Sequence, residues 1–152
     1  MAIAGAAATL TGLIFVGVSI SLKQILDTPR LPGRAAEALI LLTTVLVISC
    51  LCLVPKQPSL LLGIEFLCVG IIVWSVTLRQ DIKILRETSA EYKKHYRVNI
   101  LLTQLSTLPY IIGGIAMLYC GYNGLYWLIS GLMMSFIKAI LDAWVLLVEI
   151  NR

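Results

Sequence analysis

Five long apolar stretches take up most of this chain, and each is long enough to cross a lipid bilayer. The hydrocarbon core of a bilayer is about 30 Å thick, which requires roughly 20 apolar residues in a helix that rises 1.5 Å per residue. Hydrophobic residues make up 59% of the 152 residues and charged residues 13%, a balance that would give a water-soluble domain large exposed apolar patches. We therefore predict an all-α integral membrane bundle, a single transmembrane domain over residues 1–152, with five spans at about 2–22, 35–54, 59–78, 99–120 and 125–148.

The lysine and arginine residues predict how these spans are oriented. Ten of the 12 basic residues fall in the first and third connections or at the C-terminal end, all on one side of the predicted membrane. The opposite side holds Lys56, and Lys138 lies within a span. Because basic loops are retained in the cytoplasm, the N-terminus is expected outside and the C-terminus in the cytoplasm. The ten residues are Lys23, Arg30, Arg34, Arg79, Lys83, Arg86, Lys93, Lys94, Arg97 and Arg152.

The polar stretch 79–98 reads as a cytoplasmic helical extension of the third span. Lys83 and Glu87 are four residues apart, a spacing that supports an exposed helix. The extension is either a solvated helix whose basic residues meet anionic lipid headgroups or a docking surface for a cytoplasmic partner.

Small and hydroxyl-bearing residues are concentrated in the first span. Several of them recur alternately four and three residues apart, which places them on one stripe of the helix. In lipid, small residues let helix backbones approach closely, and such packing replaces hydrophobicity as the force that joins helices. The stripe is predicted either to contact other spans of the same chain or to line a homo-oligomeric axis or pore. Its members are Gly5, Thr9, Gly12, Val16, Ser19 and Lys23.

Glu65 lies about seven residues into the third span, at a depth where an unpaired carboxylate costs at least ~2.5 kcal/mol. It must therefore be protonated, hydrogen-bonded or in contact with water. Thr9 and Thr11 of the first span lie at a similar depth and are its expected partners. Glu65 is then either a neutral structural group or part of an ion or proton site.

Lys138 and Asp142 stand one helical turn apart in the fifth span, so each can neutralise the other. By depth they belong to the inner half of the membrane, level with Glu37 of the second span and Lys23. The predicted role is either a structural ion pair or a charged vestibule at the cytoplasmic mouth of a path.

The sequence lacks the motifs of several other classes of protein. No nucleophile is paired with a base and no cofactor cradle is present, so we expect no enzyme, no catalytic residue and no cofactor. Cys50 and Cys52 are two residues apart, which points their thiols apart on a helix, and no metal site is expected. The net charge of +4 follows from the basic loops, and nucleic-acid binding is not expected.

The runs AGAAATLTGLIFVGVSISL and PGRAAEALILL, at residues 4–22 and 32–42, resemble small bacterial membrane proteins, some of them named modulators of the FtsH protease. The resemblance covers the first two spans and implies a multi-pass protein of the bacterial inner membrane with a regulatory role. A fainter resemblance is to Orai calcium channels, whose pore helix is rich in small residues around a glycine like Gly12 and whose second helix is similar to TTVLV at 43–47. This chain departs from the channel pattern in its five spans, in its first helix running from outside to inside, and in Ile20, which stands where the pattern has its selectivity carboxylate.

Two functions remain open from the sequence. The first is an oligomeric, ion-conducting or ion-translocating pore with the first span near the axis. The second is a non-conducting accessory protein that binds a larger membrane partner, such as a membrane protease, through the stripe and the 79–98 helix. The intramembrane charges favour the first, because they are costly and usually functional.

Overall fold

Helices form throughout the part of the chain that the computed structural model describes, which is residues 1–27, 31–87 and 93–150. No strand occurs in these ranges, so the predicted all-α class is confirmed for them. The helices in chain order are α1 (Ala2–Ile20), α2 (Leu22–Asp27), α3 (Leu31–Leu51), α4 (Ser59–Glu87), α5 (Lys93–Cys120), the short 3₁₀ turn η2 (Gly121–Gly124) and α6 (Leu125–Ile150).

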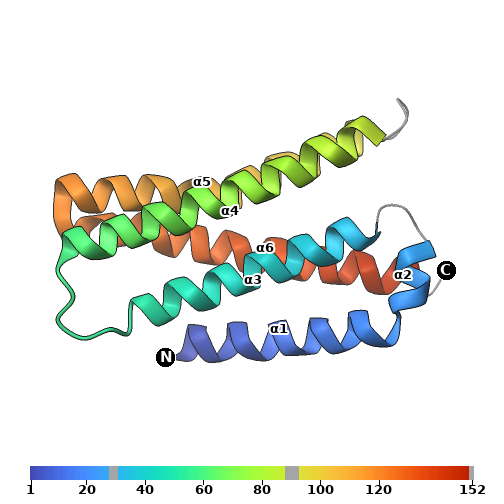
Figure 1. The fold of residues 1–152 in the computed structure, drawn as a ribbon, viewed down its shortest axis with the longest axis horizontal. Helices are drawn as coiled ribbons and strands as arrows, with labels where there is room; N and C mark the ends of the chain where they lie inside the picture. The colour runs from blue at the N-terminus through green and yellow to red at the C-terminus, as the bar shows by residue number, and fades with distance from the viewer. Residues whose placement is uncertain (28–30, 88–92, 151–152) are drawn as a thin grey trace.

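Four helical segments are long and apolar enough to cross a membrane: Ala2–Ile20, Leu31–Leu51, Ser59–Leu85 and Arg97–Val148. The last of these contains η2, where the chain turns back, and it therefore consists of α5 and α6 lying antiparallel (Figure 1). The N-terminus and the end of α6 lie at opposite ends of the bundle (Figure 1).

The polar stretch predicted at 79–98 is divided between two helices. α4 continues past the predicted end of the third span as far as Glu87, and Lys93–Val98 already belongs to α5. Residues 88–92 lie outside the described residues, as do Arg30 and Arg152 of the basic set used for orientation.

The long helices pack in the order α1, α3, α6, α5, α4, which differs from their order in the chain. α4 and α5 share the most extensive contact, followed by α5 with α6, α3 with α6, and α1 with α3. α3 also touches α4, although less extensively. The α3–α4 and α5–α6 pairs are each joined by a short connection at the same end of the bundle (Figure 1).

Glycines allow the close contact between α4 and α5. A Cβ atom added to Gly114 would lie 2.9 Å from the backbone nitrogen of Leu67, and one added to Gly70 would lie 3.2 Å from the backbone nitrogen of Ile111. At Gly114 a side chain would force the backbone of α4 to shift, and at Gly70 the facing backbone would have to give by a few tenths of an ångström. Small residues at a close helix crossing are typical of packing in membranes.

A buried apolar cluster fills the half of the bundle nearest η2. It joins α3, α4, α5 and α6, and α1 contributes Ala7. Within α1, which is described in full, Ala7 is the only buried residue, so this helix lies at the edge of the bundle and leaves most of its surface uncovered. The main members of the cluster are Val45, Ile48, Leu62, Phe66, Tyr110, Met117 and Leu128.

Candidate functional site

Four charged side chains meet between α3 and α6 near the end of the bundle opposite η2. We call Arg34, Glu37, Lys138 and Asp142 the charge cluster. The Lys138 ammonium forms ion pairs with both carboxylates: its Nζ lies 3.4 Å from Glu37 Oε2 and in direct contact with Asp142 Oδ2. The guanidinium of Arg34 lies 3.7 Å from Asp142 Oδ1. The cluster is thus a chain of alternating charges in which Lys138 stands between the two acids.

Burial differs across the charge cluster. Glu37 is 4% exposed, Lys138 2% and Asp142 1%, whereas 27% of the Arg34 side chain is accessible. Burying ionised groups costs several kcal/mol each, which attraction and hydrogen bonds must offset. Arg34 is therefore the member through which the cluster meets its surroundings.

Two side chains of α5 complete the shell of donors around Glu37. Asn99 donates from Nδ2 to Glu37 Oε2 at 3.3 Å, and the Thr103 hydroxyl donates to Glu37 Oε1. Thr103 is fully buried and Asn99 nearly so. Both carboxylate oxygens of Glu37 consequently face hydrogen-bond donors.

Helical spacing explains how each element presents its polar residues. Residues three or four apart lie on one face of a helix. This relation holds for Arg34 and Glu37 on α3, for Asn99 and Thr103 on α5, and for Lys138 and Asp142 on α6. The predicted pairing of Lys138 with Asp142, and their level with Glu37, are confirmed by the ion pairs.

Buried hydroxyls continue from the charge cluster along the contact of α5 with α6. We call Thr103, Ser106, Tyr110 and Ser135 the hydroxyl seam. The Tyr110 and Ser135 hydroxyls lie 2.7 Å apart, and Ser135 Oγ donates to the Ser106 carbonyl oxygen at 3.3 Å. All four side chains are at most 1% exposed. The seam ends at Tyr110, which belongs to the apolar cluster.

Glu65 lies apart from the charge cluster, near the η2 end of the bundle. It is half-buried and accepts a hydrogen bond from Gln57 Nε2 at 2.7 Å. The Tyr122 hydroxyl in turn donates to the Gln57 carbonyl oxygen at 2.9 Å.

The expected pairing of Glu65 with Thr9 and Thr11 is wrong. The hydroxyls of these threonines donate to carbonyl oxygens of α1 itself, those of Gly5 and Ala7. α1 packs on α3, whereas Glu65 belongs to α4, whose main neighbour is α5. The equal depth predicted for Glu65 and the two threonines therefore does not bring these residues into contact.

The stripe predicted on the first span points away from the bundle. All six members, Gly5, Thr9, Gly12, Val16, Ser19 and Lys23, are exposed. A Cβ added to Gly5 or to Gly12 would meet no atom within 4 Å. The alternative in which the stripe contacts other spans of the same chain is wrong, because α1 uses the opposite face, with Ala7 at its centre, to reach α3.

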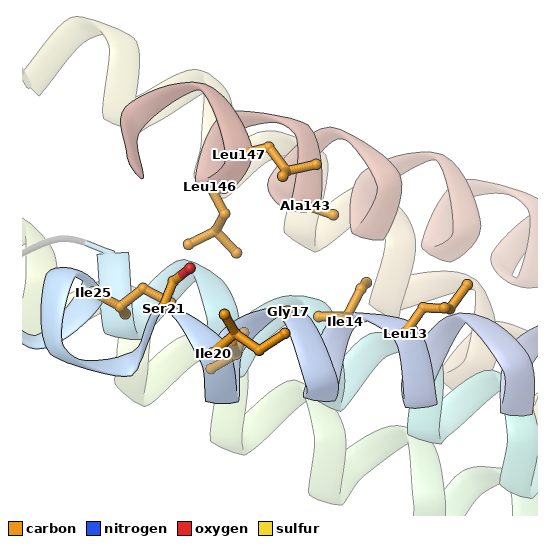
Figure 2. A pocket seen from close by; sticks show the side chains of 10 residues that line it. Leu13, Ile14, Gly17, Ile20, Ser21, Ile25, Ala143, Leu146 and Leu147 are labelled. Atoms are coloured by element: carbon orange, nitrogen blue, oxygen red, sulfur yellow. The ribbon is translucent and has the colours of Figure 1, made fainter. Parts of the chain in front are cut away.

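An apolar groove of about 320 Å³ runs between α1–α2 and the last turns of α6. Figure 2 shows Leu13, Gly17 and Ile20 on one wall and Ala143, Leu146 and Leu147 on the other. No member of the charge cluster lines this groove. Its lining is almost entirely apolar and is therefore compatible with contact to lipid acyl chains.

Sequence reasoning missed Asn99 and Thr103, the Arg34 contact, and the hydroxyl seam. The sequence signal for these contacts was the recurrence, along one face of α5, of residues with polar side-chain atoms: Asn99, Thr103, Ser106 and Tyr110. Among the described residues, no group of three or more His, Cys, Asp or Glu side chains is arranged to hold a metal ion.

Comparisons of the chain with protein families, with curated proteins and with solved structures found no match, so the site is interpreted from its own chemistry.

Proposed function

We propose that this chain is a five-span protein of the bacterial inner membrane that translocates an ion, and that the charge cluster is the site through which the ion passes. The observation that carries this proposal is the burial of Glu37, Lys138 and Asp142 within apolar helices that are long enough to cross a membrane. Ionisable groups at such positions are costly, and in membrane proteins they usually belong to ion or proton paths.

A purely structural ion pair explains the cluster less well. Replacing a buried ion pair by apolar residues of similar volume is often neutral or stabilising. Helices that only need to be held together can be joined by the glycine contacts seen between α4 and α5. Three buried charges with two further donors are therefore best explained by a function that needs charge.

The test is flux in proteoliposomes. Glu37→Gln keeps the shape of the side chain and much of its hydrogen bonding but removes its charge, and we expect it to abolish most of the ion flux of the wild type. Asp27→Asn is the matched control, because it makes the same chemical change at an exposed carboxylate of α2. Equal flux in wild type and Glu37→Gln would contradict the proposal.

Glu65 is the proposed outer site of the same path. Glu65→Gln should lower the flux while preserving the fold, since an amide can keep one hydrogen bond with Gln57. Unchanged flux would leave Glu65 a structural group that joins α4 to the preceding loop.

The orientation can be measured independently. Single cysteines at Asn123 and Lys83, both exposed, should report the two sides in a background without native cysteines. We expect an impermeant thiol reagent added outside to label Asn123→Cys and to leave Lys83→Cys unlabelled, because the basic connections are predicted in the cytoplasm. Labelling of Lys83→Cys and not of Asn123→Cys would mean that the topology is the reverse of the predicted one.

A second function is favoured by the uncovered face of α1. A helix that leaves small and hydroxyl-bearing residues uncovered is suited to close packing against another membrane helix. That helix belongs either to a second copy of this chain, as an oligomeric pore requires, or to a larger membrane protein to which this chain is an accessory. A wild type that passes no ion at any pH or voltage would favour the accessory role.

A further inference from the structure

The position between Glu37 and Asp142, where a translocated cation would bind, is occupied by the Lys138 ammonium. Nζ of Lys138 contacts Glu37 Oε2 at 3.4 Å and also contacts Asp142 Oδ2. This ammonium is covalently tethered, 2% exposed and enclosed by α3 and α6. From this arrangement we infer that the translocated ion is the proton, an inference that rests on the function proposed above.

The remaining carboxylate oxygens also face donors rather than open space. Glu37 Oε1 accepts from the Thr103 hydroxyl, Glu37 Oε2 accepts additionally from Asn99 at 3.3 Å, and Asp142 Oδ1 faces Arg34 at 3.7 Å. Metal cations such as Na⁺ bind several oxygen ligands that offer free lone pairs. A metal ion would have to displace Lys138 and would still meet the N–H groups of Asn99 and Arg34.

The difference between a metal ion and a proton lies in the ligands that each needs and not in the charge that each adds. Two carboxylates already face one ammonium and one guanidinium, so the ionised cluster is neutral. Na⁺ and a proton would each add the same positive charge, but Na⁺ would also need oxygen ligands, and the carboxylate oxygens already face Lys138, Asn99 and Arg34. A proton can be added with less rearrangement, because it forms a covalent O–H bond and needs no coordination shell.

The Lys138 ammonium stays paired with a carboxylate when a proton binds to Asp142. When hydronium transfers a proton to the Asp142 carboxylate, an O–H bond forms, one water molecule is released, and the ion pair between Lys138 and Asp142 is lost. The ammonium keeps its contact with Glu37. Deprotonation to water reverses these changes. The cluster is open to its surroundings on the side of Arg34, the accessible member, and the proposal requires water to enter there.

The hydroxyl seam places further groups that exchange hydrogen bonds beside the charge cluster, in a helix contact that leaves its side chains fully buried. Thr103 contacts Glu37 directly, and Ser135 stands one helical turn from Lys138 and 2.7 Å from the Tyr110 hydroxyl. Hydroxyl groups both donate and accept, but Ser106 and Ser135 also bond to backbone carbonyl oxygens, so these bonds do not form an unbroken hydroxyl chain from Thr103 to Tyr110. Beyond Tyr110, the apolar cluster with Phe66 and Met117 separates the seam from the Glu65 end of the bundle.

Two measurements test the inference. In proteoliposomes with a potassium diffusion potential, wild type should change the luminal pH in the direction set by the sign of that potential, as read by a trapped pH dye. It should not take up radioactive Na⁺. Uptake of Na⁺ that Glu37→Gln abolishes, with no proton flux, would overturn the proton inference and keep the proposed function. Absence of both fluxes would overturn the inference, and if K⁺ and Cl⁻ also fail to pass, the proposed function falls with it.

The second measurement concerns the position of Lys138. The melting temperature of wild type in detergent should be the same in NaCl and in choline chloride of equal ionic strength. In Lys138→Met, a mobile cation can replace the lost ammonium, so NaCl should raise the melting temperature relative to choline chloride. Lys138→Arg is the control that keeps a tethered cation and should show no such shift.

Specific stabilisation of wild type by Na⁺ would overturn the inference, because it would mean that a metal ion already has access to the carboxylates. If Lys138→Met does not fold, the comparison of the two salts on wild type still decides this point. A Lys138→Met protein that folds and shows no Na⁺ shift would mean that the ammonium does not fill a cation position, which also counts against the inference.

Discussion

Lys138→Met is expected to destabilise the protein by about 3–5 kcal/mol, the usual consequence of removing one partner from a buried ion pair. Methionine nearly matches the lysine stem in length, so the loss arises from charge rather than from a cavity. Glu37 and Asp142 would remain buried next to each other, with only the more distant Arg34 to compensate them. Thermal unfolding in detergent measures the effect, and Lys23→Met, at an exposed lysine, is the matched control.

Neutralising the acids should reverse much of that loss. The triple variant Glu37→Gln, Lys138→Met and Asp142→Asn has no uncompensated carboxylate and should unfold at a higher temperature than Lys138→Met alone. This recovery is expected because the single variant is penalised mainly by the charges it leaves unpaired. If the triple variant is no more stable than the single one, the charge cluster contributes through its shape and not through its charges.

The sequence was sufficient to predict the charge pair on one helix, because that pair depends only on local geometry. Lys138 and Asp142 are four residues apart, and any helix brings such residues together. Glu37 could be placed at their level by counting residues from the ends of its span. Both predictions use the length and the period of a helix, which are the same wherever the helix lies.

Contacts between different helices could not be predicted in this way. Asn99 and Thr103 of α5 donate to Glu37 of α3, although α4 separates the two helices in the chain and α6 lies between them in the packing order. Glu65 was assigned to Thr9 on depth alone, which is insufficient because α1 and α4 lie at opposite ends of the packing order. Depth gives one coordinate of a residue, and the order of helices around the bundle gives the other.

Small residues posed the same problem. Gly12 of the first span and Gly114 of α5 look alike in the sequence, since both stand in apolar helices among other small residues. Only Gly114 lies at a close contact within the chain, 2.9 Å from the Leu67 backbone nitrogen when a Cβ is added. Which glycine packs inside depends on which faces the helices turn toward each other.

Gly114→Leu should therefore be strongly destabilising and Gly12→Leu should not. The leucine at 114 would be driven into the backbone of α4, which cannot move aside as a flexible side chain can, and overpacking of this kind typically costs about 1–3 kcal/mol or more. At Gly12 the added side chain meets no atom of the chain within 4 Å. Thermal unfolding compares the two variants, and equal melting temperatures would mean that α4 and α5 are not packed through Gly114.

Mass measurement of Gly12→Leu tests the stripe itself. A smaller oligomer than wild type would show that α1 joins copies of the chain, since the leucine would force the helices apart. An unchanged oligomer would show that lipid covers this face.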